Sequence, residues 1–138
     1  MSSKEFLNKI RYIDMMINCK VEQISELRSM LLPSAIRYDK DKVQTSPSSD
    51  SITDTIAKVV ELEEKLDADI DRLVALKSVA RDKIERMEND VEKVILYKRY
   101  FNNKSFENIA VECGYSWRHI HRLHADALKN FDKIYKMS

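Results

Sequence analysis

Apolar residues recur at every third or fourth position along most of this chain, and this period constrains its fold more than any other feature. In the first segment the repeating positions are Phe6, Ile10, Ile13, Ile17, Ile24, Leu27 and Leu31. Their spacing is that of a heptad seam, so it predicts a helix from Ser3 to about Leu32 with a narrow apolar stripe. Pro33 is expected to end this helix.

A second long helix is predicted to begin near Ser51, whose hydroxyl can cap it, with Asp54 in its first turn. Its apolar positions again repeat at about 3.5 residues. They are Ile52, Ile56, Val59, Leu62, Leu66, Ile70, Leu73, Leu76, Ala80, Ile84 and Met87. Asn89 or Asp90 is expected to end this helix and to cap the next one. A continuous helix through Asn89 is the alternative.

The segment between these helices, residues 33–50, lacks the period. Proline, serine and aspartate surround its charged centre, which is the composition of a linker. We expect a mobile loop there, and a short helix over Ala35–Val43 is the alternative. Residues 1–89 are therefore interpreted as a long-helix coiled-coil or oligomerisation region that a linker interrupts.

Two helices with narrow apolar stripes cannot each bury their stripe alone. They can fold back on each other as an antiparallel hairpin, or they can pair with another copy of the chain. The second helix is longer than the first, so part of its seam is expected to face something else. A homodimer through the long helices is the prediction, and the sequence leaves open whether the first helix packs in cis or swaps.

The composition favours an all-α protein, because the 138 residues include one glycine and two prolines. No apolar run approaches the roughly 20 residues of a membrane span, and the charged N-terminus lacks a signal-peptide core. Cys19 and Cys113 suggest no disulfide framework, so we expect a cytoplasmic protein whose cysteines are small buried groups. The methionines, including Met15, Met16, Met30 and Met87, are expected to fill the apolar seams.

Residues 90–138 are predicted to form a separate small domain of three helices. The first helix runs over residues 91–101, and Asn102–Asn103 form a turn because asparagine tolerates a left-handed backbone. A short helix over residues 106–112 and a last helix over residues 117 to about 135 follow. The whole chain is thus expected to be a long helical hairpin or coiled coil followed by a small helix-turn-helix domain.

Local signals place the caps and the core of this domain. Ser105 and Ser116 are expected to cap the second and third helices, and Gly114 gives the bend between them. The tyrosines Tyr97, Tyr100 and Tyr115 are expected to pack around the domain with their hydroxyls outward. The inward positions are Val91, Val94, Ile95, Leu96, Phe106, Ile109, Ala110, Ile120, Leu123, Ala127, Leu128 and Phe131.

Charge is divided unevenly along the chain. Residues 1–89 hold 15 Lys and Arg against 17 Asp and Glu, whereas residues 90–138 hold 9 against 6 and all three histidines. The outward residues of the last helix are Trp117, Arg118, His119, His121, Arg122, Asp126 and Lys129, with His124 at the margin. A basic and aromatic helix that follows a tight turn favours binding in the major groove of double-stranded DNA.

Each of these side chains has a chemistry that suits DNA. Arginine can pair bidentately with guanine, histidine can donate or accept a hydrogen bond, and Trp117 can pack against a thymine methyl or the sugar-phosphate backbone. Substituting Arg122 is expected to cost about 1–3 kcal/mol if it reads a base. The residues expected to contact phosphates are Ser105, Lys104, Arg99 and Lys98.

A longer pattern runs through the same region. It comprises Arg99-Tyr100-Phe101, Ser105-Phe106-Glu107-Asn108-Ile109-Ala110, Gly114-Tyr115-Ser116, Ile120 and Ala125-Asp126-Ala127-Leu128-Lys129. This pattern resembles the fourth conserved region of sigma-70-type factors, which reads the promoter −35 element and touches the RNA polymerase flap. The resemblance places Trp117, Arg118, His121 and Arg122 at DNA contacts, with His119 on the adjacent backbone side.

The chain departs from that family in its recognition surface, where Trp and His replace the usual Arg and Glu, so its target need not be a −35 element. Residues 1–89 do not resemble the aromatic-rich region that melts the −10 element, so this is not a complete sigma factor. A coiled coil followed by such a module is similar to small phage-encoded regulators of the ArpU-like kind. The resemblance implies a DNA-binding transcription regulator, with RNA polymerase as a possible second partner.

Other functions remain as alternatives. The DNA-recognition subunit of a phage packaging terminase also joins such a module to oligomerising helices, and a polymerase-binding adaptor would use the module without DNA. No catalytic arrangement or glycine-rich phosphate loop is present in the sequence, so we expect neither an enzyme nor a cofactor. His119, His121 and His124 with Cys113 invite a metal site, but no second Cys or carboxylate completes a zinc set at the usual spacing.

Overall fold

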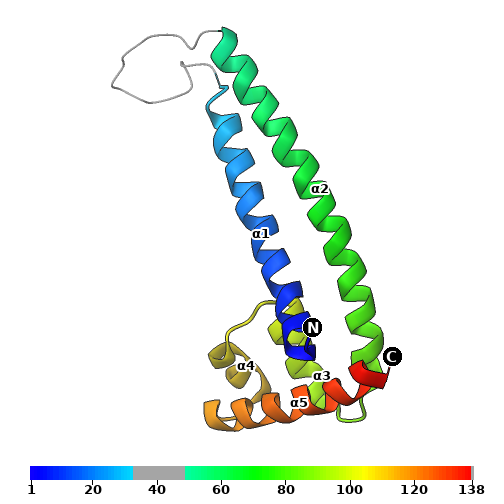
Figure 1. Ribbon diagram of the computed structural model, residues 1–138. Helices are drawn as coiled ribbons and strands as arrows, with labels where there is room; N and C mark the ends of the chain where they lie inside the picture. The colour runs from blue at the N-terminus through cyan, green and yellow to red at the C-terminus, as the bar shows by residue number, and fades with distance from the viewer. Residues whose placement is uncertain (33–48, 138) are drawn as a thin grey trace. The chain divides into compact units, whose positions relative to one another are not determined.

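The computed structural model describes residues 1–32 and 49–137, and every regular element within them is a helix (Figure 1). The elements are α1 (Ser3–Ser29), α2 (Ser49–Glu85), α3 (Asp90–Leu96), the π-helical η1 (Tyr97–Phe101), α4 (Phe106–Cys113) and α5 (Trp117–Met137). The prediction of an all-α fold is therefore confirmed for the described residues. The alternative helix over residues 35–43 and nearly all of the expected linker lie outside them.

The described helices belong to two units. One comprises residues 1–14 and 72–138, and the other comprises residues 15–71. The first holds 17 Lys and Arg against 11 Asp and Glu, a net charge of +6, and we call it the basic unit. The second holds 7 against 12, a net charge of −5, and we call it the acidic unit. Charge is thus separated more sharply between the units than between residues 1–89 and 90–138.

In the acidic unit the two long helices pair with each other along the same chain. Lys20 forms an ion pair with Asp69, and Arg28 forms one with Glu63. The residue that lies later in α1 therefore pairs with the residue that lies earlier in α2. The two helices run antiparallel, as in a helical hairpin. Ile24 and Val59 are buried in this unit.

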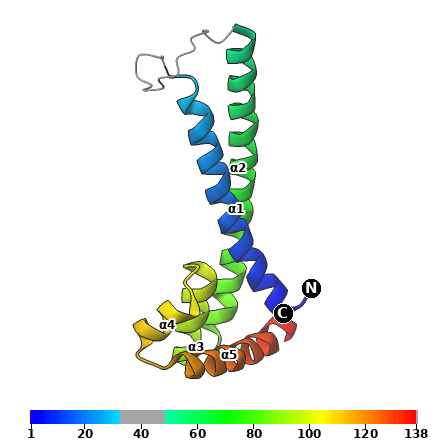
Figure 2. The same ribbon diagram turned by 90° about the vertical axis from the view of Figure 1, so that its left-hand side faces the viewer.

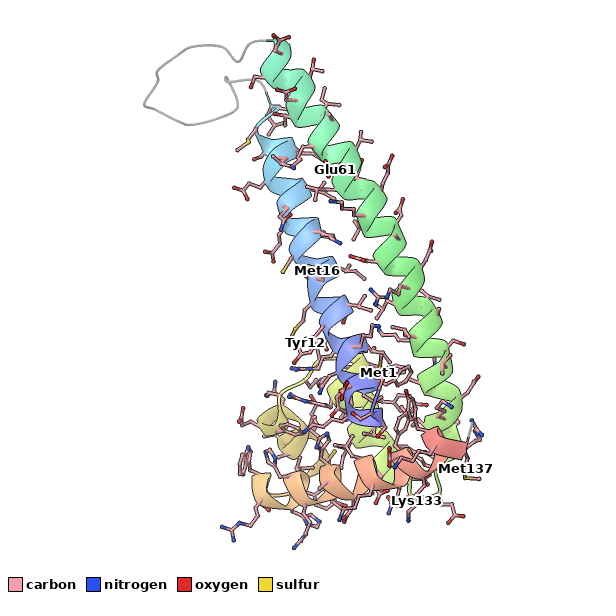
Figure 3. The ribbon with its side chains drawn as sticks, in the orientation of Figure 1. Met1, Tyr12, Met16, Glu61, Lys133 and Met137 are labelled. Carbon is pink, nitrogen blue, oxygen red and sulfur yellow. The ribbon has the colours of Figure 1, made fainter. Side chains whose placement is uncertain are left out.

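Several apolar side chains that were expected in the seams are exposed instead. Ile52, Ile56 and Ile70 of α2 are exposed, as are Met15, Met16 and Met30 of the first helix and its turn. Figure 3 shows the Met16 side chain on the outer side of α1. Each helix of a two-helix hairpin has one neighbour, so only one stripe of its apolar face can be covered. Cys19 is also exposed, so its expected burial is wrong.

The ends of the long helices differ slightly from the expected ones. α1 begins as predicted, because Ser2 Oγ accepts a hydrogen bond from the amide of Glu5 at 3.1 Å. It ends at Ser29 rather than near Leu32, because its last turn tightens and the amide of Leu31 bonds to the carbonyl of Arg28. α2 begins at Ser49, so Ser51 lies within the helix instead of capping it.

The break between α2 and α3 is confirmed. α2 ends at Glu85, and Asn89 caps α3 by accepting a hydrogen bond from the amide of Glu92 at 3.0 Å. The carboxylate of Glu92 is buried and accepts a hydrogen bond from Asn130 of α5 at 2.7 Å. This cap therefore fixes where α3 begins and also ties it to α5.

The core of the basic unit joins all of its helices. Ile95, Ile109, Ala110 and Ile120 form its centre, where α5 packs against both α3 and α4 (Figure 2). The start of α1 adds Phe6, whose ring stacks on Phe131 with centroids 6.5 Å apart. This compact unit therefore extends beyond the expected 90–138 domain, because the start of α1 and the end of α2 supply part of its core.

One expected core position of the basic unit is wrong. Val94 is 41% exposed. The buried face of α3 is formed by Glu92, Ile95 and Leu96, and Val94 lies outside that face. The expected seam position Met87, at the end of the long-helix region, is buried as predicted.

Candidate nucleic-acid interface

Short-range contacts fix both the start of α4 and the turn between α4 and α5. Ser105 Oγ caps α4 by accepting from the amide of Asn108 at 3.2 Å. Gly114 ends that helix with φ +74°, and the amide of Tyr115 bonds to the carbonyl of Ala110 at 3.0 Å. Ser116 Oγ then caps α5 by accepting from the amide of His119 at 3.1 Å. All three predicted turn and cap residues are confirmed.

The turn before α4 is also confirmed. Asn103 has a left-handed backbone with φ +55°. Its side-chain amide donates to the carboxylate of Asp14, near the start of the chain. The preceding π-helical turn closes with a bond from the amide of Asn102 to the carbonyl of Tyr97 at 3.0 Å. This turn is therefore anchored from both sides, and it directs α4 against α5.

A column of side chains in contact with one another leads from the unit's interior to its surface. The Arg99 guanidinium lies 4.1 Å from the centroid of the Phe106 ring. Phe106 in turn contacts His121 at 4.4 Å, and His121 contacts Trp117 at 3.9 Å between ring centroids. Trp117 ends the column and is 54% exposed. The expected recognition residues Trp117 and His121 are thus brought together, but they have different surroundings.

His121 lies beneath the exposed ring of Trp117, on the side toward the core. Its side chain is half-buried, and its Nε2 atom is fully buried without a hydrogen-bond partner among the described residues. The rings of Phe106 and Trp117 both contact its ring. The sequence-based expectation placed His121 among the outward residues, whereas in the structure it is half-buried and in contact with two aromatic rings.

The remaining residues that were expected to contact DNA on this helix lie at the surface of α5. Arg118 and Arg122 are exposed, and His119 is half-buried with its ring against Tyr115 at 4.9 Å. Arg122 donates a hydrogen bond to His119 Nδ1 at 2.7 Å, so this nitrogen is the acceptor in the pair. The first turns of α5 therefore present one indole and two guanidinium groups.

His124 is not at the margin of this surface but inside the core, which corrects the expectation. Its Nε2 lies 2.8 Å from the hydroxyl of Tyr100. Burial lowers the pKa of His124 to about 4, with further lowering by Arg99, Lys4 and His121. Burial also raises the pKa of Tyr100 to about 12. The expectation that the Tyr100 hydroxyl points outward is therefore wrong.

The residues expected to contact phosphates make contacts within the unit. Lys98 and Lys104 both pair with Glu112 of α4, and the hydrogen bonds from Lys104 and then Lys98 hold the pKa of that carboxyl below its usual range. Arg99 also donates to the carbonyl of Lys104 at 3.1 Å, and burial lowers its pKa. The Ser105 hydroxyl is engaged as the helix cap. Phosphate contacts by these side chains would compete with these bonds.

Lys129, which was expected among the outward residues of the last helix, and Lys133, which was not, continue the arginine face of α5. Arg118, Arg122, Lys129 and Lys133 follow steps that keep them on one side of a helix, and all four are exposed. The signal was available in the sequence, because it needs only the helix period extended by three turns.

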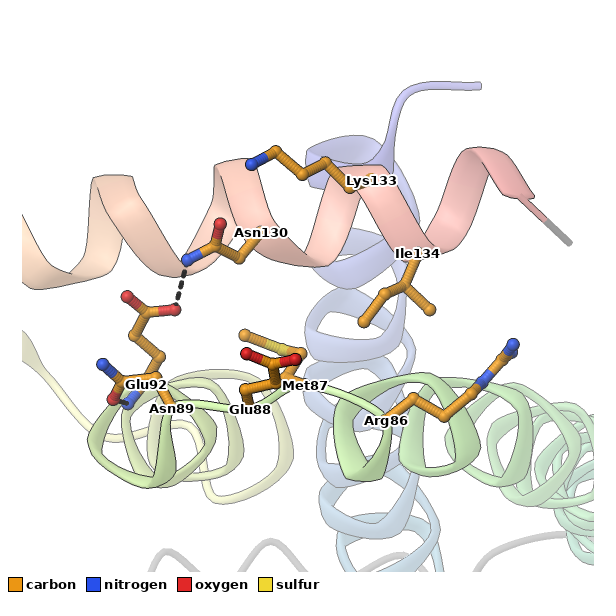
Figure 4. Close-up of a pocket in the computed structure, with 8 residues that line it drawn as sticks. All are labelled: Arg86, Met87, Glu88, Asn89, Glu92, Asn130, Lys133 and Ile134. Atoms are coloured by element: carbon orange, nitrogen blue, oxygen red, sulfur yellow. Dashed lines mark hydrogen bonds between the residues drawn. The ribbon is translucent and has the colours of Figure 1, made fainter.

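Lys133 also borders a cavity at the other end of α5 (Figure 4). The cavity measures about 430 Å³ and lies between α5 and the junction of α2 with α3. Met87 and Ile134 supply its apolar wall, and the bonded pair Glu92 and Asn130 forms one side. Acidic and basic side chains both line it, so it does not favour a ligand of either charge.

Neither a metal site nor a helix suited to a membrane is found among the described residues. Within residues 1–32 and 49–137, no three His, Cys, Asp or Glu side chains come together as a metal site requires. None of the helices in those residues is both long and apolar enough to cross a bilayer. Comparison with protein-family models, with curated proteins and with solved structures finds no match to this chain. The resemblance to the sigma-70-type region therefore remains a prediction from the residues that carry it.

Proposed function

We propose that this protein is a sequence-specific DNA-binding transcription regulator in which α4, the turn at Gly114 and α5 act as a helix-turn-helix. The observation that carries the proposal is the surface of α5, where Trp117, Arg118 and Arg122 project into solvent directly after a capped turn. The N-terminal turns of such a helix are the part that meets base edges in the major groove. We further infer, from the resemblance, a phage-derived regulator similar to sigma region 4.

The charge of the two units supports this proposal. The basic unit carries +6 and the acidic unit carries −5. A polyanion is attracted to the first and repelled by the second, so the charge distribution favours approach of DNA through the basic unit. Because exposed charges are screened by salt, this preference is strongest at low ionic strength.

The length of the basic face on α5 suggests how it divides its contacts. From Arg118 to Lys133 the helix rises about 22 Å, which exceeds the width of about 12 Å of the major groove. With its first turns in the groove, the helix would carry Lys129 and Lys133 toward a flanking phosphate strand. Arg118 and Arg122 then read bases or grip the near strand, and the lysines add affinity without sequence preference.

A homodimer through the acidic unit is part of the proposal. Ile52, Ile56 and Val60 are exposed at four-residue intervals on α2, so they form an apolar row beside the stripe that the hairpin buries. A second copy can cover this row and would present two DNA-reading helices to two half-sites. The net charge of −5 opposes that pairing, so the apolar contacts must outweigh the repulsion.

RNA polymerase is proposed as a further partner because of the resemblance, and the structure offers an exposed side chain for such a contact. The outer face of α4 offers Val111, which is 81% exposed, beside the exposed Glu107. An exposed apolar side chain on this face is available to a protein partner while α5 contacts DNA. Pull-down of polymerase by the wild-type chain and its loss in Val111→Glu would support this contact.

Selection of bound duplexes from random double-stranded DNA tests the main proposal. We expect the wild-type chain to enrich a defined sequence, and Arg122→Ala to weaken or relax that enrichment. Lys58→Ala, an exposed substitution in the acidic unit, is the matched control and should leave it unchanged. Polymerase capture without any DNA enrichment would instead favour the adaptor, and a ring larger than a dimer would favour the packaging subunit.

A further inference from the structure

Trp117 combines exposure with rigid support. It is the only tryptophan of the chain and the first residue of α5, and 54% of its surface is exposed. Its inner face lies against His121, with ring centroids 3.9 Å apart. A large apolar ring at such a position needs a reason, because its burial elsewhere would stabilise the fold.

The support beneath Trp117 reaches into the core. His121 rests on Phe106, and Phe106 rests both on the Arg99 guanidinium and, edge to face, on His124 at 4.9 Å. His124 is fixed in turn by its bond to the Tyr100 hydroxyl. A side chain held by such a column loses little rotational freedom when it binds, so its outer face is prepared for a contact.

The neighbours of the indole restrict what that contact can be. Arg118 follows it in the chain, and Arg122 lies one turn further along the same helix. Two guanidinium groups suit guanine edges or phosphates, whereas the indole offers an apolar surface. The apolar group that a base pair presents in the major groove is the C5 methyl of thymine.

We propose that Trp117 reads the C5 methyl group of one thymine in the target, and that the stack of His121, Phe106 and Arg99 positions the indole for this contact. The inference rests on the proposed function, because it assigns a specificity to the same helix. It makes Trp117 a specificity-determining residue and His121 a positioning residue that does not contact DNA. A contact of the indole with a sugar or with a protein would not depend on a base methyl.

Replacing thymine by deoxyuridine tests the proposal, because this removes the methyl and leaves the pairing edge intact. Each thymine of the selected duplex is replaced singly, and affinity is measured by fluorescence anisotropy at one salt concentration. For the wild-type chain we expect one position to weaken binding by about fourfold, the value of one buried methyl group. The other positions should change binding little.

The same measurements on variants of the protein identify the side chain that contacts the methyl group. Trp117→Ala should bind the thymine duplex and the deoxyuridine duplex with equal affinity. Trp117→Phe, which keeps an aromatic face, should retain part of the difference in affinity between them. Arg122→Ala should bind more weakly overall and keep the full difference between thymine and deoxyuridine. Because Trp117 is exposed, thermal unfolding of Trp117→Ala should match the wild type within a few degrees, which checks that the fold persists.

The outcomes separate this inference from the proposed function. If the wild-type chain binds its selected duplex but shows no loss at any thymine, or keeps the same loss in Trp117→Ala, the methyl contact is wrong and DNA binding stands. A selected site without thymine would overturn the inference in the same way. If the chain binds no duplex even at low salt, the proposed function fails together with it.

Discussion

The hydroxyl of Tyr100 lies 2.8 Å from Nε2 of His124 inside the basic unit, where both side chains are buried. The pair joins η1 to the middle of α5, and the Phe106 ring lies against the same histidine. Because burial lowers the pKa of His124 to about 4, the imidazole is neutral at physiological pH. Protonation of this ring would therefore destabilise the folded unit.

Acidification should destabilise the basic unit through His124. The folded pKa of about 4 lies below the usual 6.5, so the unfolded chain binds the extra proton more readily. Stability is then fully present above pH 6.5 and is lost as pH falls toward 4. Between pH 7 and pH 5 the loss in the free energy of unfolding should reach about 2 kcal/mol, measured by urea denaturation. His124→Gln should flatten this dependence, and an unchanged slope in that variant would contradict the assignment.

Substitution of Gly114 should lower the stability of the fold because of the backbone conformation at this position alone. Its φ of +74° is left-handed, and an added Cβ would meet no atom within 4 Å. Gly114→Ala should therefore lower the free energy of unfolding by about 1–2 kcal/mol without a steric clash. Gly114→Asn should cost less, since asparagine tolerates this conformation. Equal losses in the two variants would show that the cost is not conformational.

Lys129 and Lys133 should control the salt dependence of DNA binding. If both contact phosphates, Lys129→Ala with Lys133→Ala should reduce the slope of log affinity against log salt by about 1.8, or about 0.9 for each contact. The reduction should be the same on selected and random duplexes. Lys58→Ala again serves as the control. A loss confined to the selected duplex would mean that the lysines read bases.

Salt should act on dimerisation in the opposite direction from DNA binding. The exposed row of Ile52, Ile56 and Val60 lies on a unit with a net charge of −5, so added salt screens the repulsion between two copies. Sedimentation equilibrium should show a stronger dimer as salt rises. Ile56→Asp should dissociate it, while Val111→Asp on α4 should not. A dimer that weakens with salt would place the interface elsewhere.

Local contacts explain which parts of the fold could be predicted from sequence. Ser105, Gly114 and Ser116 act through bonds to residues three or four positions away, and Asn89 does the same at the start of α3. Such signals are complete within a few residues of sequence. The caps of α3, α4 and α5, the turns that flank α4 and the order of the helices were therefore predictable, whereas the expected cap at Ser51 was wrong.

The number of neighbours around a helix could not be predicted in the same way. The heptad spacing of Ile52 and Ile56 indicates that this face of the helix is apolar. It does not indicate how many neighbouring helices cover that face. The prediction for Val94 was wrong for a related reason. The elements that pack against a short helix determine which of its apolar sides is buried.

The interior of the candidate site depended on contacts that the sequence does not encode locally. Tyr100 and His124 are 24 residues apart, and Lys98 and Glu112 are 14 apart. The period of α5 placed His124 at the edge of its outer face, and only the packing of Phe106 and Tyr100 puts it inside. The sequence therefore located the exposed face of α5 but not the side chains that hold it in place.

The fluorescence of Trp117 offers the most direct measurement of the central claim, because this is the one tryptophan in the chain. The full chain is titrated with its selected duplex and with a random duplex, while emission and acrylamide quenching are recorded. If the first turns of α5 enter the groove, the selected duplex should shift the emission to the blue and protect the indole from quenching. Saturable DNA binding with unchanged emission and quenching would contradict the claim, because DNA would then lie away from this helix.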